Sequence, residues 1–215
     1  MTGISFHVSD KIVIAGYSGA GKSTLLQYFI KHVFEKFRHT KLIIVDPTAR
    51  FSVRAKKTYN GTVKCLEPRK NKICIKISGE ERYEALIARL NKYYDPTFLV
   101  TDEVDGYIRT NYLPYNFGIY SEQGRNWNQG GCFTVRRLGA LNKSILSNAH
   151  YLILFQVRNR MDRMYLESIL DVDIDRLFGN LGEHDFAVID MHLSKLLGIY
   201  RLSGNKLIKS GLKPE

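Results

Sequence analysis

Nine residues near the start of the chain, positions 16–24, have the types and the spacing of a loop that holds a triphosphate. The glycines let successive backbone N–H groups turn towards phosphate oxygens with no Cβ in the way. The lysine of such a loop reaches the β- and γ-phosphates, and the hydroxyl that follows it is a ligand of Mg²⁺. The pattern therefore predicts a site for a nucleoside triphosphate and Mg²⁺, formed by Gly16, Tyr17, Ser18, Gly19, Ala20, Gly21, Lys22, Ser23 and Thr24.

Two adjacent acids, Asp102 and Glu103, end a second apolar run further along the chain. A nucleotide hydrolase needs one carboxylate that holds the Mg²⁺ shell and another that orients and deprotonates the attacking water. We assign the first role to Asp102 and the second to Glu103. The alternative is a pair of acids that merely caps a strand at the surface, and the phosphate loop upstream favours catalysis. Asp46, which ends another apolar run, is expected either beside the metal or in a turn with Pro47.

The phosphate loop needs a strand before it and a helix after it, and the sequence supplies both. The apolar run 11–15 predicts the strand. After the loop, apolar residues recur at helical spacing and predict an amphipathic helix. They are Leu25, Leu26, Phe29, Ile30, Val33, Phe34 and Phe37.

Runs of apolar residues, rather than alternating patterns, are typical of parallel strands that are covered on both faces. Their alternation with helical patterns predicts an α/β fold, a three-layer sandwich with a mostly parallel central sheet. We expect one domain over 1–215, with a core at about 11–190 and a C-terminal extension at 191–215. The expected strands are 11–15, 42–46, 63–66, 73–77, 98–102, 132–135, 151–156 and 186–190, with an edge strand within 196–207. The expected helices are 22–37, 80–94, 122–128, 141–147 and 161–170.

The composition is that of a soluble globular protein, with 44% apolar and 25% charged residues in 215. No apolar run approaches the roughly 20 residues that span a bilayer, so we do not expect a membrane protein. Positions 1–10 lack the features of a signal peptide. The three cysteines have no metal-ligand spacing, which indicates reduced thiols and an intracellular setting.

The charge balance is strongly basic. The chain has 32 Lys and Arg against 21 Asp and Glu, a net charge of +11, and its pI is about 9.5. This excess favours a polyanionic partner, nucleic acid before membrane. Two segments are considered for that contact. The aromatic stretch 105–120 is expected at a subunit interface or in the core rather than on DNA, and the predicted basic turn with Arg69, Lys70 and Lys72 is the better candidate for phosphates.

Motifs downstream of residue 124 resemble those of the FtsK–HerA superfamily of DNA-pumping ATPases. A Gly124-Arg125 pair precedes the strand at 132–135, which Arg136 and Arg137 follow. A helix, a strand that ends at Gln156 and a helix that starts with Met161-Asp162 come next. The segment 42–47 is similar to the second-strand motif of the HerA branch. The resemblance covers roughly residues 11–190.

The resemblance implies a RecA-like fold of the additional-strand, catalytic-glutamate type, with ATP and Mg²⁺ as ligands. It places Lys22 and Ser23 on the triphosphate and Mg²⁺, Asp102 on the metal and Glu103 as the base. Arg125 matches the position of an arginine finger that would reach the γ-phosphate of a neighbouring subunit. The family commonly has a Gln sensor where this chain has Arg136. The sequence leaves open whether Arg136 senses phosphate, is the finger or does neither, and whether Arg137 beside it is the finger instead. Gln156 falls in a later strand and is a further candidate.

Within the superfamily the chain is most similar to the small genome-packaging ATPases of membrane-containing icosahedral viruses, including archaeal ones. That resemblance implies ATP hydrolysis coupled to the movement of double-stranded DNA into a preformed capsid, by a homo-oligomeric ring with six subunits as the expected number. The accessory domains of the other branches have no counterpart in the sequence. The implied partners are DNA and a capsid or portal/membrane protein, and the implied location is the host cytoplasm and the virion vertex.

Two other functions remain open at this point. One is a cellular ATPase of the same superfamily that acts in conjugation or DNA-end processing. The other is a nucleotide-gated switch with little turnover. A GTPase is disfavoured, because Asn142-Lys143-Ser144 lacks the acid that completes a guanine-binding motif.

Overall fold

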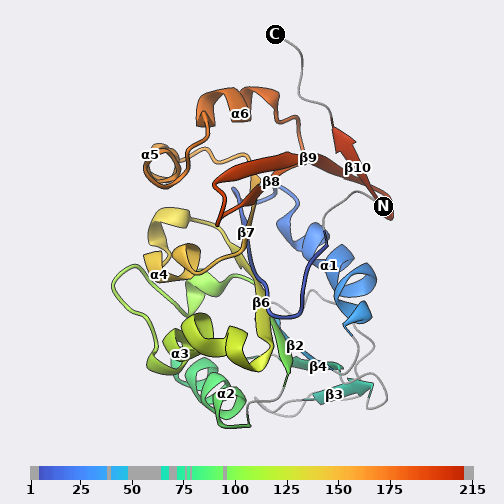
Figure 1. The fold of residues 1–215 in the computed structure, drawn as a ribbon, viewed down its shortest axis with the longest axis vertical. Coiled ribbons are helices and arrows are strands. Elements are labelled where there is room, and N and C mark those ends of the chain that lie inside the picture. Colours follow the sequence, from blue (N-terminus) through green and yellow to red (C-terminus); the bar gives the residue numbers. More distant parts are fainter. Residues whose placement is uncertain are drawn as a thin grey trace.

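The computed structural model describes residues 5–37, 40–47, 64–67, 72–75, 77, 79–93 and 96–210. Within these residues ten strands form one sheet, in the order β10-β9-β8-β7-β1-β6-β5-β2-β4-β3 (Figure 1). The strands are β1 (Lys11–Ala15), β2 (Lys41–Val45), β3 (Lys64–Glu67), β4 (Lys72–Ile75), β5 (Thr97–Thr101), β6 (Gln129–Val135), β7 (Tyr151–Phe155), β8 (Asp185–Asp190), β9 (Lys195–Ser203) and β10 (Lys206–Ser210).

The centre of the sheet is parallel and both of its edges are antiparallel. β7, β1, β6, β5, β2 and β4 all run in one direction. β3 pairs antiparallel with β4 at one edge, and β8, β9 and β10 pair antiparallel at the other. β6 lies between β1, which leads into the phosphate loop, and β5, which leads to the acidic pair. The expected additional strand is therefore present.

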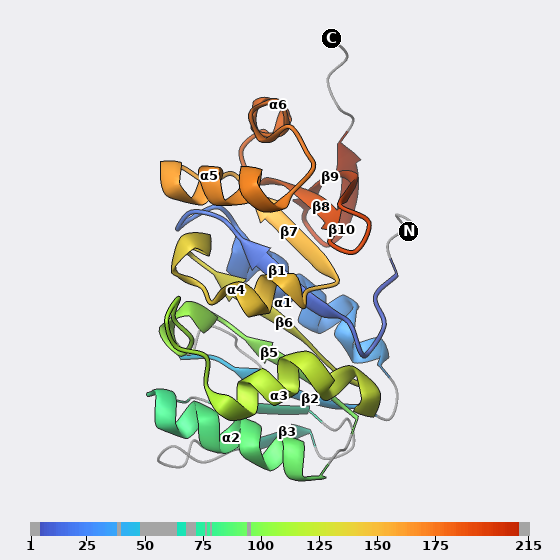
Figure 2. The same ribbon diagram turned by 60° about the vertical axis from the view of Figure 1, so that its left-hand side comes forward.

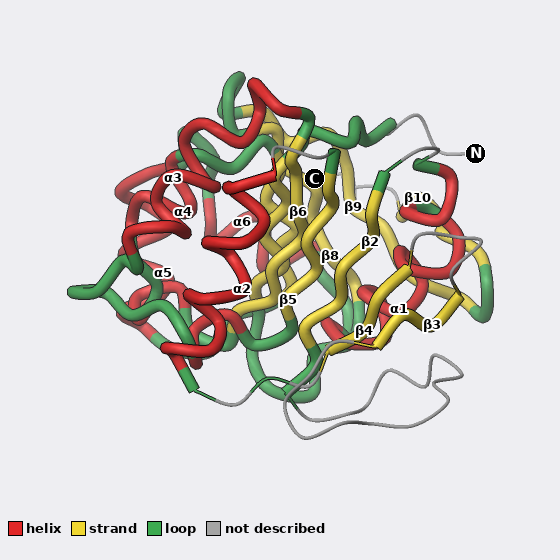
Figure 3. Tube along the Cα trace, turned by 90° about the horizontal axis from the view of Figure 1, so that it is seen from below, coloured by secondary structure: helices red, strands yellow, loops and turns green. Residues whose placement is uncertain are grey.

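Helices cover both faces of the sheet, so the expected three layers are confirmed. Figures 2 and 3 show α1 on one face and α2, α3, α4 and α5 on the other. The helices are α1 (Lys22–His32), α2 (Glu80–Tyr93), α3 (Tyr115–Gln123), α4 (Lys143–Ser147), α5 (Arg160–Ile169) and α6 (Ile174–Asn180), with short 3-10 helices at Phe34–Lys36, Val104–Gly106, Gly124–Trp127 and Leu138–Ala140.

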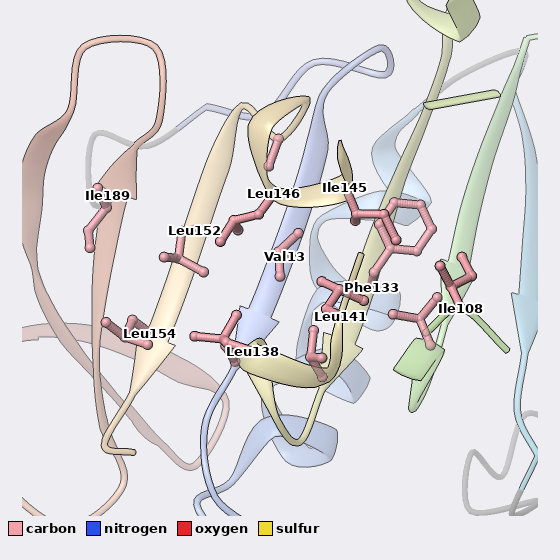
Figure 4. Close-up of a cluster of buried hydrophobic side chains, with 14 of the residues drawn as sticks. Val13, Ile108, Phe133, Leu138, Leu141, Ile145, Leu146, Leu152, Leu154 and Ile189 are labelled. Atoms are coloured by element: carbon pink, nitrogen blue, oxygen red, sulfur yellow. The ribbon is translucent and has the colours of Figure 1, made fainter. Parts of the chain in front are cut away.

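Each face of the sheet has its own apolar core, because the parallel strands are buried on both sides. On the α1 side Ile12 and Ile14 of β1 pack with Leu25, Leu26 and Phe29 of α1. On the other side Val13 and Phe133 pack with Leu138, Leu141 and Leu152 (Figure 4). Alternate residues of β1 therefore anchor opposite layers, which holds the loop that follows β1 from both faces.

Some predicted boundaries are wrong, each for a local reason. The helix predicted at 22–37 ends at His32, because the chain tightens after Val33 into a 3-10 turn at Phe34–Lys36. The helix predicted at 122–128 lies earlier, at Tyr115–Gln123, where Phe117 and Tyr120 face the core, and only a 3-10 turn follows it. The single edge strand predicted within 196–207 is a hairpin of β9 and β10, which turns at Gly204 in the left-handed region.

The sequence prediction missed α6. Its helical signal is nonetheless present, because Ile174, Leu177 and Phe178 are buried at helical spacing and the Asp173 side chain accepts the Arg176 N–H at the helix start.

The aromatic stretch 105–120 belongs mainly to the core, which was one of its two expected locations. Tyr107, Phe117 and Tyr120 are buried, while Tyr112 and Tyr115 are exposed. The Tyr107 hydroxyl donates to the Ile77 carbonyl, and the Tyr120 hydroxyl donates to the Gly130 carbonyl. The other DNA candidate, the basic turn, lies outside the described residues at Arg69 and Lys70, as does the side chain of Lys72.

Candidate functional site

The phosphate loop leaves the carboxyl end of β1 in the middle of the sheet and closes against β7. Gly16 has a φ of 155°, and a Cβ there would lie 2.6 Å from the Cβ of Phe155. Gly19 and Gly21 also have positive φ, at 91° and 108°, and nothing lies within 4 Å of a Cβ built on Gly19. The loop therefore has glycine where the chain is crowded or left-handed, and its middle opens onto free space.

Lys22, the first residue of α1, holds this loop in shape. It is only 7% exposed, and its ammonium donates to the carbonyls of Gly16, at 2.7 Å, and Tyr17, at 2.9 Å. Burial lowers the pKa of Lys22, and the carboxylates of Asp105, Asp102 and Glu103 act in the opposite direction. A buried ammonium whose partners are two neutral carbonyls favours an anion that enters the loop.

The acidic pair lies next to the loop because β5 and β6 are in register. Thr101 at the end of β5 is opposite Phe133, so Asp102 comes beside Thr134. The Thr134 hydroxyl donates to Asp102 Oδ1 at 2.5 Å and accepts the backbone N–H of Glu103 at 2.8 Å. Both Asp102 and Thr134 are buried. One hydroxyl thus fixes the carboxylate and the backbone of the two predicted catalytic acids.

Glu103 is held in a strained backbone conformation. Its φ of 54° and ψ of 51° are left-handed, which is uncommon for a residue with a long side chain. Such a conformation persists only where the surroundings impose it, and it occurs often in functional sites. Here the Thr134 hydrogen bond imposes it, and the turn directs the Glu103 carboxylate towards Arg136.

Arg136 lies in the same site as the phosphate loop of its own chain. Its guanidinium is 3.5 Å from Glu103 Oε2 and 3.9 Å from Asp105 Oδ2, and its side chain is half-exposed. Burial raises the pKa of Asp105, and Arg136 opposes that rise. Arg136 therefore faces the general-base candidate of its own chain.

A cavity of about 190 Å³, which we call the nucleotide cavity, brings together residues of the phosphate loop and the acidic pair. Its lining includes Ser18, Gly19, Gly21, Lys22, Ser23 and Thr24 of the loop and its helix, with Asp102, Glu103 and Arg136 opposite them. The Ser23 hydroxyl and the Asp102 carboxylate are the hard oxygen donors that Mg²⁺ prefers. The open glycine loop and the buried ammonium suit phosphates. The residues present therefore fit a triphosphate with Mg²⁺.

Thr134 had no role in the sequence prediction, although a hydroxyl in an otherwise apolar strand beside the loop strand is the signal that could have revealed it. Thr134→Val keeps the side chain's shape and removes its hydroxyl. We expect it to cost about 1–3 kcal/mol in the free energy of unfolding, since a buried carboxylate loses a donor, and to lower kcat, since Glu103 loses its anchor. Urea denaturation and steady-state hydrolysis measure both effects.

The matched control is Thr134→Ser, which retains the hydroxyl and should keep most of both properties. A valine variant as stable and as active as the parent would contradict the role given to the hydroxyl.

Arg125 lies far from the phosphate loop of its own chain. It is exposed in the 3-10 turn Gly124–Trp127, before the first residue of β6. The loop follows the other end of the parallel strand β1. Seven residues of β6 separate those ends, about 20 Å at 3.3 Å per residue. Its positive charge also lowers the pKa values of Lys11 and His150 at that far end. Arg125 therefore has no access to its own site.

A buried lysine, Lys11, begins β1 on the same side of the sheet as Arg125. Burial, with Arg125 as the second cause, lowers the pKa of Lys11 from 10.5 to about 8, and Asp10 opposes the shift. Between pH 8 and pH 10.5 the unfolded chain then binds a proton that the folded chain does not, so stability rises with pH in this window. The rise is at most about 3 kcal/mol.

Lys11→Met removes this contribution. We expect the difference in unfolding free energy between the parent and Lys11→Met to shift in favour of the parent as pH rises from about 7 to about 10. Urea denaturation along that pH series measures the shift. Lys195→Met, at an exposed position of β9, should show no such trend, and a constant difference for Lys11→Met would contradict the assignment.

Three weaker candidates are also placed. The Gln156 side-chain amide donates to the Leu181 carbonyl at 2.7 Å, and Gln156 is not among the lining residues of the 190 Å³ cavity. Asp46 is buried at the end of β2, where the neighbouring Val45 carbonyl accepts the Asp102 N–H. Arg137 does not line the nucleotide cavity but a second one beside it.

The fold is similar to solved structures of nucleotide hydrolases. The genome-packaging NTPase B204 of Sulfolobus turreted icosahedral virus 2 with ATP-gammaS has a TM-score of 0.71 at 17% identity, over 90% of this chain and 98% of that one. The DNA-packaging ATPase B204 of Sulfolobus turreted icosahedral virus has a TM-score of 0.67 at 18% identity, over 88% and 96%.

EssC ATPases 2 and 3 from Geobacillus thermodenitrificans have a TM-score of 0.55 at 13% identity, over 84% of this chain and 37% of theirs. At these identities the likeness is one of fold, and it agrees with the resemblance found in the sequence. No protein-family model matches the chain, and comparison with curated proteins gave no match. Within the described part of the chain, no helix has the length and apolar character of a bilayer span.

Proposed function

We propose that the chain is an ATP-hydrolysing motor that moves double-stranded DNA into a preformed capsid. The observation that supports it most is the single cavity that unites Lys22, Ser23, Asp102 and Glu103 in a sheet with the additional strand between β1 and β5. Two solved structures with this fold are those of a genome-packaging NTPase and a DNA-packaging ATPase. The basic charge of +11 suits a nucleic-acid substrate.

The residues of the cavity divide the chemistry among them. Lys22 turns from the Gly16 and Tyr17 carbonyls to the β- and γ-phosphates when ATP binds. Bound Mg²⁺, held by Ser23 and Asp102, would neutralise charge on the phosphates. Glu103 accepts a proton from the attacking water. The left-handed turn at Glu103 and its bond to Thr134 keep that carboxylate over the loop.

Arg136 competes with this role of Glu103. Its guanidinium lies 3.5 Å from Glu103 Oε2, so this ion pair offsets part of the negative charge of the carboxylate. The γ-phosphate is a stronger anionic partner for an arginine than a single carboxylate. We infer that Arg136 moves to the phosphate when ATP binds and so acts as the sensor of its own subunit.

We propose Arg125 as the finger that acts on a neighbouring subunit, since it is exposed at the amino end of β6, remote from the phosphate loop of its own chain. In a heterologous, head-to-tail contact, the amino ends of the parallel strands in one subunit would face the phosphate loop of the next subunit. Repetition of this contact closes a ring. We propose a hexamer, located in the host cytoplasm and at the virion vertex, with a capsid or portal/membrane protein as its partner.

Hydrolysis measured against protein concentration and added duplex DNA tests the proposal. We expect the specific activity to rise with concentration, because the complete site needs two subunits, and to rise again with duplex DNA. A nucleotide-gated switch would show little turnover and no response to DNA. Movement of duplex against a bound roadblock separates translocation from DNA-stimulated hydrolysis alone.

A further inference from the structure

A second, larger cavity lies directly beside the nucleotide cavity. It has a volume of about 530 Å³, and Tyr17, Arg136, Arg137, Arg158 and Asn159 are among its lining residues. We refer to it as the arginine cleft. Arg136 and Ser18 line both cavities, so the two share a wall. The cleft opens between the carboxyl ends of β6 and β7, which precede Arg136 and Val157.

The accessible charge of the arginine cleft is positive. Arg137 and Arg158 are exposed, and neither forms an ion pair with another described residue. The two carboxylates in the lining are already engaged. Asp162 is buried and accepts the Gly139 N–H at 2.8 Å, and Asp105 is paired with Arg136. Two guanidinium groups therefore face the cleft without an anionic partner.

Arg158 is positioned before any ligand arrives. Its guanidinium carbon lies 4.0 Å from the centre of the Tyr17 ring, within the range of a cation–π contact. A guanidinium stacked on a ring keeps its N–H donors free at its edge, where a phosphate accepts two of them side by side. The stacking also restricts the side chain, so less conformational freedom is lost on binding.

Tyr17 connects this arginine with the nucleotide. Its carbonyl accepts the Lys22 ammonium, and its N–H donates to the Gln156 carbonyl at 3.2 Å. When Lys22 turns to a triphosphate, the Tyr17 peptide loses one of these partners while its ring still carries Arg158. The occupancy of the nucleotide cavity and the position of Arg158 therefore depend on the same residue.

We infer that the arginine cleft holds a backbone phosphate of duplex DNA through Arg137 and Arg158, and that Tyr17 couples this grip to the nucleotide. The inference rests on the proposed translocase function. A duplex fits better than an acidic protein segment because its phosphates present a dense row of bidentate acceptors at the surface, and because the net charge of the chain is +11. Coupling is reciprocal, so ATP changes the affinity for DNA by the same factor by which DNA changes the affinity for ATP.

Fluorescence anisotropy of a labelled duplex of about 20 base pairs, between about 50 and 200 mM salt, tests the grip. For Arg137→Ala/Arg158→Ala we expect affinity to fall by about tenfold or more and the salt slope to decrease by about one, because the two arginines hold one phosphate. The matched control is Arg89→Ala, an exposed arginine on α2, at the other end of the sheet from α5 (Figures 1 and 2).

A second pair of variants tests the coupling with little change in charge. Tyr17→Phe keeps the ring face and should keep the DNA affinity and its dependence on a non-hydrolysable ATP analogue. Tyr17→Leu removes the face, and we expect weaker DNA binding and a loss of that dependence. Circular dichroism shows whether each variant folds like the parent, and native mass spectrometry shows whether it assembles like the parent.

Each outcome distinguishes the cleft from the function on which it rests. If the parent binds no duplex, the proposed function fails. If the parent binds duplex and the double arginine variant matches it in affinity and slope, the cleft inference is overturned while the translocase proposal stands. A variant that loses assembly but retains DNA affinity would also overturn it, since the arginines would then contact a neighbouring subunit.

Discussion

Glu103→Gln is expected to lower the rate of ATP hydrolysis by about 10²- to 10⁴-fold while nucleotide binding persists. The amide has the size of the carboxylate but accepts no proton from water, and the loss is that of a general base. The backbone N–H of residue 103 still donates to Thr134, so the left-handed turn has the same support. Lys22 and the glycine loop, which we expect to bind the phosphates, are unchanged.

Phosphate release under saturating ATP measures the rate, and a fluorescent ATP analogue measures the affinity. Glu122→Gln, at an exposed position of α3, is the control for the same chemical change and should hydrolyse ATP like the parent. Parental turnover by Glu103→Gln would remove Glu103 from the role of base. Loss of nucleotide binding together with turnover would point instead to a collapsed cavity.

Arg125→Ala is expected to lower hydrolysis by about 10³- to 10⁵-fold, the range observed when a finger arginine is lost. The physical reason is the location of Arg125 at the end of β6 remote from its own loop. In the proposed role the arginine stabilises charge on the γ-phosphate of the neighbouring subunit, so we expect the deficit only in assembled protein. The affinity of the isolated subunit for ATP is expected to stay at the parental value.

A mixing experiment identifies the finger. Lys22→Ala lacks a working loop but supplies Arg125, whereas Arg125→Ala supplies the loop. Each is inactive alone, and an equal mixture should recover about a quarter of the parental activity, because a random ring places the two intact halves at about a quarter of its interfaces. Arg89→Ala should be active alone. A mixture that stays inactive, with assembly intact, would rule out Arg125 in trans.

Much of the site could be predicted because it is local in sequence. The loop from Gly16 to Gly21 has positive φ at Gly16, Gly19 and Gly21, where glycine is the residue best tolerated, so its sequence specifies its shape. The pairing of Asp102 with Glu103 after an apolar run follows from the same kind of local rule. The sheet and its layers were predictable for a related reason, since a parallel strand that is buried on both faces must be apolar throughout.

Boundaries and partners across strands were less predictable. α3 was misplaced because the aromatic residues Phe117 and Tyr120 give no clear helical signal until they are seen against the core. The role of Thr134 depends on the register of β6 against β5, and no spacing along the chain contains that register. The same register brings Arg136 to Glu103.

Sequence alone therefore determined the chemistry that the chain can carry: a phosphate loop, a lysine, a hydroxyl and two carboxylates. Tertiary structure decided which of these groups and which arginines lie together in one site of the same chain. The central strands are parallel, so their carboxyl ends all lie on one side of the sheet and their amino ends on the other. Arg136 follows the carboxyl end of β6, beside the phosphate loop of its own chain, whereas Arg125 precedes the amino end of β6. The stacking of Arg158 on Tyr17 joins residues 141 positions apart, and only the packing of β7 beside β1 brings them together.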